Sequence, residues 1–193
     1  ISGRYHNPRE EDRIFMFLDL KSSTTIAEKL GHLKFSRLIQ DCFYDLTDVV
    51  KNYNAEIYQY VGDEAVITWQ LNDGLTHDNC IRFYFAYKEQ LLKRSNYYEK
   101  HYGLLPQFKA GINCGKVTVA EVGEVKTEIA YHGDVLNTSA RIQSMCNEFG
   151  KELLISEFLK DELDLSGFKV SNMGEIMLKG KIKPVIIYSV EQK

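Results

Sequence analysis

The stretch Ile14-Phe-Met-Phe-Leu-Asp-Leu-Lys-Ser-Ser-Thr24 is an apolar, strand-like run that ends in a carboxylate, Asp19, and then in a small hydroxyl-rich turn. A second stretch, Ile57-Tyr-Gln-Tyr-Val-Gly-Asp-Glu-Ala-Val-Ile-Thr-Trp69, contains two strand-like runs joined at Gly62-Asp63, a pair typical of a hairpin turn. Two carboxylates at strand ends can share a pair of hard divalent cations, as phosphoryl-transfer sites require. A helix cap or a hairpin tip explains either aspartate alone, whereas the two together favour a metal site.

Composition limits the classes of protein that the chain can represent. Its 193 residues fit one domain, and 44% hydrophobic with 26% charged residues is typical of a soluble globular protein. A net charge of −3 argues against nucleic-acid binding through a basic surface, and no segment has the apolar length of a membrane span. The four cysteines lack the spacing of a zinc site, which predicts reduced thiols in a cytosolic domain.

The ends of the chain suggest a larger context. The chain begins with Ile rather than Met, so we expect a piece of a longer protein, in which membrane or sensor segments could come first. Residues 1–12 are polar and contain Asn7-Pro8, which predicts a linker, and residues 13–193 then form the folded domain. We therefore expect a cytoplasmic domain, and a membrane-anchored full-length protein is compatible with this expectation.

Helix and strand patterns alternate along the rest of the chain. Apolar residues recur at helical spacing from Phe35 to Val50, and a second helix is predicted from about Asp78 to Tyr102. The remaining predictions are strands over 108–114 and 117–122 around a turn at Gly115, a helix over 133–150, a strand over 153–156, a helix over 158–163 and a hairpin over 174–190. This order predicts an α+β fold, in which helices cover a mixed, mostly antiparallel sheet.

Five motifs together resemble the catalytic domain of class III nucleotide cyclases, the adenylate and guanylate cyclase family. They are Phe17-Leu-Asp-Leu-Lys-Ser-Ser-Thr24 with Ala27-Glu28 and Gly31; Val61-Gly-Asp63; Gly111-Ile-Asn-Cys-Gly115; Gly133-Asp-Val-Leu-Asn-Thr-Ser-Ala-Arg141; and Leu178-Lys-Gly180. They follow the family's order and span almost the whole chain. The resemblance implies a ferredoxin-like core and an intramolecular reaction, in which the ribose 3′-hydroxyl attacks the α-phosphate of a nucleoside triphosphate and pyrophosphate leaves.

By this resemblance, Asp19 and Asp63 hold two divalent cations, Mg²⁺ or Mn²⁺, with the carbonyl of Leu20 as a further ligand. Backbone N–H groups of the turn containing Ser22, Ser23 and Thr24 suit a phosphate at a helix start. The family usually has Gly where Ser22 stands.

The resemblance gives the second half of the site to another part of the chain. Asn137 orients the ribose, Arg141 stabilises charge on the α-phosphate, and Lys179 binds the terminal phosphates, with Lys116 as a further phosphate contact. Asp134 is expected to cap the helix that carries Asn137 and Arg141. Because one domain supplies the aspartates and its partner supplies the other residues, the family architecture implies a head-to-tail homodimer with two equivalent sites.

The substrate base is ambiguous in the sequence. The two positions that select the base in the family are Gln59 and Ala130, which match neither the adenine nor the guanine pattern. A primary amide both donates and accepts hydrogen bonds, so Gln59 is compatible with either purine and with either pyrimidine. The prediction is ATP, with guanylate and pyrimidine (UTP or CTP) cyclases as alternatives. A further alternative is a module that binds nucleotide without turnover.

Overall fold

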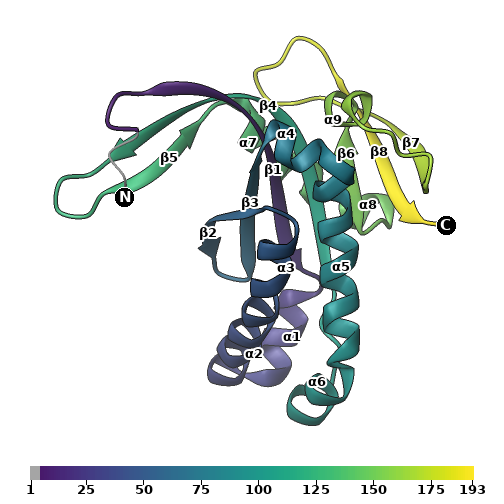
Figure 1. The fold of residues 1–193 in the computed structure, drawn as a ribbon. Coiled ribbons are helices and arrows are strands. Elements are labelled where there is room, and N and C mark those ends of the chain that lie inside the picture. Colours follow the sequence, from purple (N-terminus) through teal and green to yellow (C-terminus); the bar gives the residue numbers. More distant parts are fainter. Residues whose placement is uncertain (1–4) are drawn as a thin grey trace.

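The computed structural model describes residues 5–193, whose strands form one eight-stranded sheet with helices on both faces (Figure 1). The strands are β1 Arg9–Leu20, β2 Glu56–Val61, β3 Glu64–Gln70, β4 Phe108–Val122, β5 Glu128–His132, β6 Leu153–Ser156, β7 Phe168–Ile176 and β8 Val185–Gln192. The helices are α1 Ser23–Leu30, α2 His32–Asp45, α3 Thr47–Asn52, α4 Leu71–Leu75, η1 Thr76–Asp78, α5 Asn79–Lys93, α6 Ser95–Tyr102, α7 Asp134–Ser144, α8 Cys146–Phe149 and α9 Glu157–Glu162.

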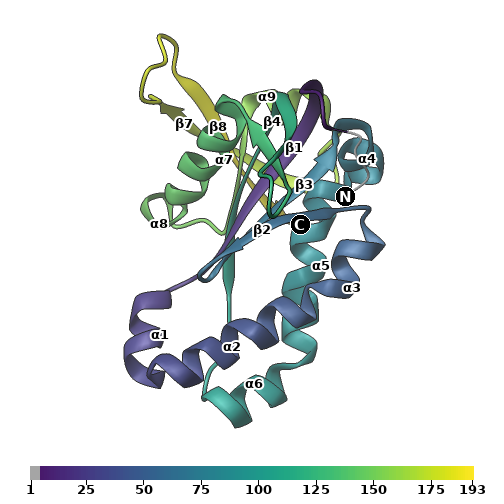
Figure 2. The same cartoon turned by 90° about the vertical axis from the view of Figure 1, so that its left-hand side faces the viewer.

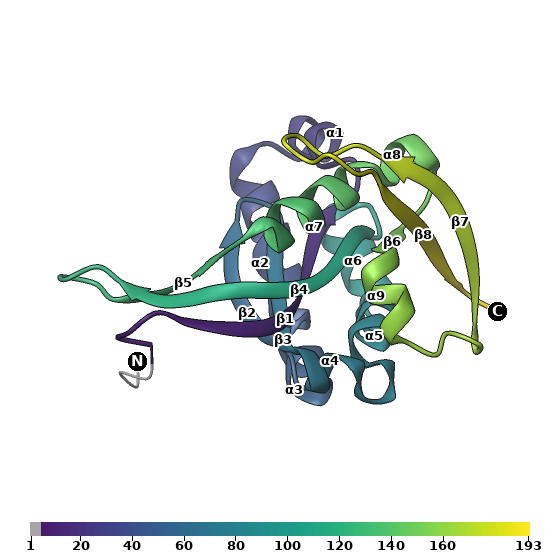
Figure 3. The same ribbon diagram turned by 90° about the horizontal axis from the view of Figure 1, so that it is seen from above.

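The sheet has the order β2-β3-β1-β4-β6-β8-β7, and β5 pairs with the outer part of β4. Among the described strands, β4 and β6 form the one parallel pair. The predicted α+β class with a mixed, mostly antiparallel sheet is therefore confirmed. Seen from above, the outer parts of β1 and β4 project from the body together with β5 as an arm (Figure 3).

The two faces of the sheet differ in their cover. Ile14, Met16, Leu18 and Leu20 of β1 point to what we call the helix face, where they pack in one core with α2, α3, α5 and α6. The alternate residues of β1 point to the opposite, open face, where Phe15 packs with residues of β4, β5 and α7. Figure 2 shows α7 and α5 on opposite sides of the sheet. The alternation of β1 places Asp19 on the open face.

Several predicted boundaries differ from the structure. β1 begins at Arg9, which pairs with Val119, so residues 9–12 belong to the sheet rather than to the expected linker. The predicted turn at Gly115 is wrong, because β4 runs through this residue without a break. A Cβ at position 115 would lie 2.7 Å from Cγ2 of Val135, so this glycine provides space for α7 rather than a turn.

The predicted long helices are each divided in two. α2 and α3 meet at Leu46, α5 and α6 meet at Arg94, and α7 and α8 meet at Met145. The strand over 153–156 occurs as predicted, and the terminal hairpin also forms, although its first strand begins at Phe168 rather than at Gly174. No helix among residues 5–193 combines the length and the apolar character needed to cross a membrane.

Candidate functional site

Two carboxylates meet at the end of β1. Asp19 pairs across the sheet with Glu64, and Asp63 lies in the turn just before that residue. The Leu20 N–H donates to the backbone oxygen of Asp63 over 3.4 Å, which fixes the hairpin tip against β1. The pKa of Asp19 is raised to about 7: burial is the largest cause, the neighbouring Asp63 and Glu64 carboxylates add to it, and Lys109 opposes them. This concentration of negative charge is unfavourable unless a cation neutralises it.

The carboxylate pair fits a divalent cation. Oδ2 of Asp63 is buried and has no hydrogen-bond partner, although buried carboxylate oxygens in proteins are normally satisfied. The described residues contain no group of three or more His, Cys, Asp or Glu side chains arranged for a metal. An ion at Asp19 and Asp63 would therefore need backbone and substrate oxygens as its other ligands, which is the usual arrangement for Mg²⁺ on phosphates.

The turn after β1 opens directly beside these carboxylates. Ser22 precedes α1 with φ 59° and ψ 33°, a left-handed conformation that costs a non-glycine residue about 1 kcal/mol or more. This left-handed conformation explains why the family usually has a glycine at this position, since glycine adopts it without strain. No side chain caps the start of α1, so the first N–H groups, from Ser23 and Thr24 onward, face outward from the helix end.

A cleft of about 580 Å³ lies between β2 and the β5 side of the arm. Gln59 and Ala130, the two predicted base-selecting residues, both line it. Tyr58 and Tyr131 also line it: their rings meet edge-to-face at 4.9 Å, and the Tyr131 N–H donates to the Tyr58 hydroxyl oxygen over 3.2 Å. The structure therefore brings together two positions that lie 71 residues apart in the chain.

Helix α7 presents Asn137 and Arg141 on its exposed side. Its buried residues, among them Val135 and Ile142, pack toward the sheet. Both polar side chains consequently face away from the open face of their own sheet, where Asp19 lies. Their orientation suits a ligand that binds on the outer side of α7, away from the sheet of the same protomer.

Lys179 lies exposed in the segment between β7 and β8, close to the start of α7. Lys181 from this segment forms an ion pair of 2.7 Å with Asp134. The predicted capping role of Asp134 is wrong: the residue at the helix cap is Gly133, and no side chain accepts a hydrogen bond there. Asp134 instead connects the Lys179 segment to α7.

Lys116 lies apart from these groups. Its side chain is exposed on β4 and forms a 3.7 Å ion pair with Glu10. In the β1–β4 ladder Lys116 pairs with Asp12, seven positions from the Lys109 that faces Asp19. The structure therefore does not bring Lys116 to the carboxylates of its own protomer.

A family model described as the adenylate and guanylate cyclase catalytic domain matches residues 6–192. The chain belongs to this family. Adenylate cyclase 2 of Rhizobium meliloti (strain 1021) is 35% identical over 191 residues, which cover 98% of this chain and 53% of that protein. Adenylate cyclase 1 of the same organism is 27% identical over 91% of this chain and 27% of its own length. The chain thus spans about half, or less, of these relatives.

Solved cyclase structures share the fold. The adenylyl cyclase CyaB from P. aeruginosa superimposes with a TM-score of 0.80 at 20% identity, covering 97% of each chain. The guanylyl cyclase Cya2 gives a TM-score of 0.81 at 21% identity, over 98% of this chain and 95% of that one. Class III cyclase domains of either named specificity therefore share this architecture.

Motif-based prediction of this cyclase domain missed one feature of the cleft that Gln59 and Ala130 line. Glu56, at the start of β2, lines the cleft and forms an ion pair with Arg13, which is almost completely buried. An available signal was the arginine that precedes the apolar run of β1, flanked by acidic residues. A charged residue at the boundary of a buried strand requires a partner.

Proposed function

We propose that this domain converts ATP to 3′,5′-cyclic AMP and pyrophosphate at a site shared between two copies of the chain. The observation that carries the proposal is the Asp19–Asp63 pair with its unpartnered buried oxygen, in a member of the cyclase family. The names of the two Rhizobium relatives support ATP as the substrate. Gln59 in the base cleft is compatible with this choice, since its amide can accept from the adenine amino group and donate to N1.

The proposed reaction forms a bond between the ribose 3′-oxygen and the α-phosphorus and breaks the bond from that phosphorus to pyrophosphate, while the hydroxyl proton passes to solvent. Asp19 and Asp63 of one chain would hold two Mg²⁺ or Mn²⁺ ions, with the Leu20 carbonyl as a further ligand. Bound there, the ions lower the pKa of the attacking hydroxyl and neutralise the triphosphate. The backbone of Ser22, Ser23 and Thr24 would receive phosphate oxygens at the start of α1.

The other chain would position the substrate for in-line attack. Asn137 would hold the ribose and Arg141 would stabilise the charge that develops on the α-phosphate, which is the usual basis of catalysis in phosphoryl transfer. Lys179 would bind the terminal phosphates. Because Asn137 and Arg141 face away from the sheet that carries their own Asp19, a head-to-tail homodimer gives each substrate both sets of groups.

Complementation between two inactive variants tests this arrangement. Asp63→Ala and Arg141→Ala should each lower turnover by about 10³-fold, since each removes several kcal/mol of transition-state stabilisation. An equimolar mixture should recover about one quarter of wild-type activity, because half of the dimers are mixed and each mixed dimer keeps one intact site of two. Cyclic nucleotide and pyrophosphate are measured with Mn²⁺ and each of ATP, GTP, CTP and UTP.

The outcomes separate the parts of the proposal. Mixtures that stay inactive although the two chains form mixed dimers would show that the site is not shared. Cyclic GMP, CMP or UMP as the main product of the wild-type protein would keep the mechanism and replace the substrate. Nucleotide binding without any cyclic product, at concentrations where the dimer forms, would indicate a binding module instead.

A further inference from the structure

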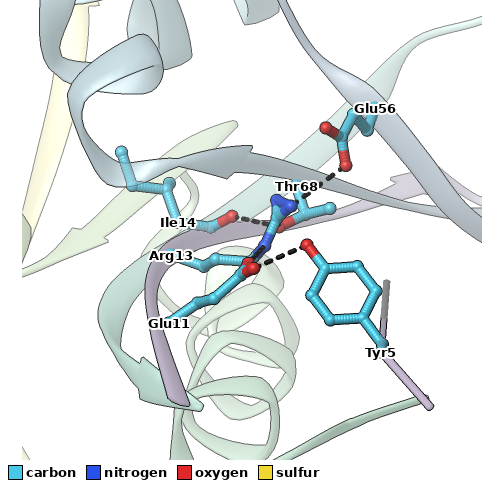
Figure 4. A network of polar contacts seen from close by, with 6 residues as sticks. All are labelled: Tyr5, Glu11, Arg13, Ile14, Glu56 and Thr68. Atoms are coloured by element: carbon cyan, nitrogen blue, oxygen red, sulfur yellow. Dashed lines mark hydrogen bonds and ion pairs between the residues drawn. The ribbon is translucent and has the colours of Figure 1, made fainter. Parts of the chain in front are cut away.

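Arg13 is the centre of a network of polar contacts (Figure 4), and two of its partners, Glu56 and Thr68, line the cleft. Its side chain is 2% exposed and contacts Glu11 Oε2 at 2.9 Å, Glu56 Oε2 at 3.2 Å and Thr68 Oγ1 at 3.4 Å. The guanidinium also lies 4.9 Å from the centre of the Tyr131 ring. A buried guanidinium is costly unless carboxylates and hydrogen-bond acceptors surround it, so these contacts fix the positions of all the partners.

Among the described residues, Arg13 contacts two carboxylates, and the more exposed of them, Glu56, lies in the cleft. One arginine faces two carboxylates, of which Glu11 is 9% exposed and Glu56 is 54% exposed. Figure 4 shows one oxygen of Glu56 directed at Arg13 and the other pointing away from it. Glu56 lines the same cleft as Gln59 and Ala130. It is thus a carboxylate acceptor in a fixed position, in a cleft where Ala130 offers no side-chain hydrogen bond.

We propose that Glu56, positioned by Arg13, is a specificity-determining residue that accepts a hydrogen bond from the exocyclic amino group of the nucleobase and excludes uracil. This inference rests on the proposed function, because it assigns the cleft to the base of the substrate. An ionised carboxylate only accepts hydrogen bonds. Adenine, guanine and cytosine each carry an amino group, whereas uracil presents carbonyl oxygens on both sides of its single N–H and would place one against the carboxylate.

The arrangement also explains how the cleft can select a base although Gln59 itself is ambiguous. The amide of Gln59 can turn over to satisfy either pattern, but Glu56 cannot change from acceptor to donor while it remains ionised. A site whose polar group is left facing a carbonyl discriminates strongly, since both groups then lose their hydrogen bonds to water. The selected substrate class is therefore a nucleoside triphosphate with an amino-bearing base.

Equilibrium binding of 3′-deoxynucleoside triphosphates tests the assignment, because these lack the attacking hydroxyl and cannot cyclise. 3′-Deoxy-ATP, -GTP, -CTP and -UTP compete against a fluorescent N-methylanthraniloyl ATP in the presence of Mn²⁺. Wild-type protein should prefer each of the first three over 3′-deoxy-UTP. Glu56→Gln should lower the ATP-over-UTP preference by about tenfold to a hundredfold, the range expected for one hydrogen bond to a charged group.

Glu191→Gln is the matched control. Glu191 is also a half-exposed strand carboxylate held by a cation, Lys151 at 2.7 Å, but it lies on β8, away from the cleft. Its replacement should leave all four affinities unchanged. An equal shift of the four affinities by Glu56→Gln, no shift, or the same shift by Glu191→Gln would overturn the inference. Wild-type protein that binds none of the four compounds would also overturn it.

Turnover measured in parallel separates this inference from the proposed function. A preference that changes with Glu56 in a protein that forms no cyclic product would support the inference and contradict the cyclase activity. Cyclic AMP formation with a base preference that Glu56→Gln does not change would support the cyclase activity and contradict the inference. Arg13→Lys tests the positioning role: an ammonium lacks the rigid planar fork that holds Glu11 and Glu56 in fixed directions, so KM for ATP should rise about tenfold while kcat changes little.

Discussion

One carboxylate oxygen of Asp63 is the strongest indication of a cation site. This atom, Oδ2, is buried without a partner beside a second carboxylate, so the folded protein should bind a divalent cation even without nucleotide. We expect millimolar Mn²⁺ to raise the melting temperature of the wild-type domain by about 3 °C, because a ligand that binds only the folded state stabilises it. Differential scanning fluorimetry with and without EDTA measures the shift.

The same experiment includes two variants. Asp63→Asn should abolish the Mn²⁺-dependent shift, whereas Asp161→Asn, on the exposed surface of α9, should keep it. An equal shift in all three proteins would place the ion elsewhere.

At the residue scale, the sequence predicted which side chains gather but not how each is held. Gln59 and Ala130 share a cleft, as the family resemblance implied, and Asp19 and Asp63 are neighbours because a hairpin tip lies beside the end of β1. The left-handed Ser22 was unforeseen because local strain depends on the tertiary context. The catalytic and binding roles of these residues remain predictions.

The contact between α7 and β4 depends on one glycine. A Cβ at Gly111 would overlap the backbone of Gln143 and lie 2.6 Å from its Cα. Gly111→Ala should therefore destabilise the domain by about 3 kcal/mol, the upper range for overpacking, and should displace the helix that carries Asn137 and Arg141. Urea unfolding followed by circular dichroism measures the change.

Gly167→Ala provides the control for backbone entropy, because no atom lies within 4 Å of the added methyl group. A free energy of unfolding that falls equally in both variants would mean that α7 does not need this close approach.

At the scale of elements, periodicity located most of the longer helices and strands, but it missed β5, α4 and η1 and did not show where the long helices are interrupted. Apolar spacing continues across Leu46 and Arg94, so helices that break there look continuous in the sequence. At Gly115 a break was predicted where the strand is continuous. The sequence alone does not distinguish a glycine that makes space for a neighbouring helix from one that forms a turn. The helix breaks and the role of Gly115 depend on tertiary packing, which the local sequence does not reveal.

At the scale of the whole molecule, a single protomer separates the two groups of residues that the proposed site requires. The carboxylates lie on the open face of the sheet, and α7 directs Asn137 and Arg141 away from it. If the site forms only between two copies, activity per chain should be constant at high concentration and fall in proportion to concentration below the dimer dissociation constant.

Initial rates from about 10 µM to 10 nM protein, combined with sedimentation velocity over the same range, measure both quantities. Constant specific activity in a protein that sediments as a monomer would contradict a shared site.

The pairing of β1 with β4 has a consequence for how the chain is made. Phe15 lies opposite Asn113, so the first strand of this domain is synthesised long before the strand with which it pairs. Until then its apolar residues and open edge are exposed on the nascent chain, a state that favours aggregation. Long-range strand pairing is also slow. Translation arrested before residue 122 should therefore leave this domain dependent on chaperones, and its folding should complete only after more than half of it has been synthesised.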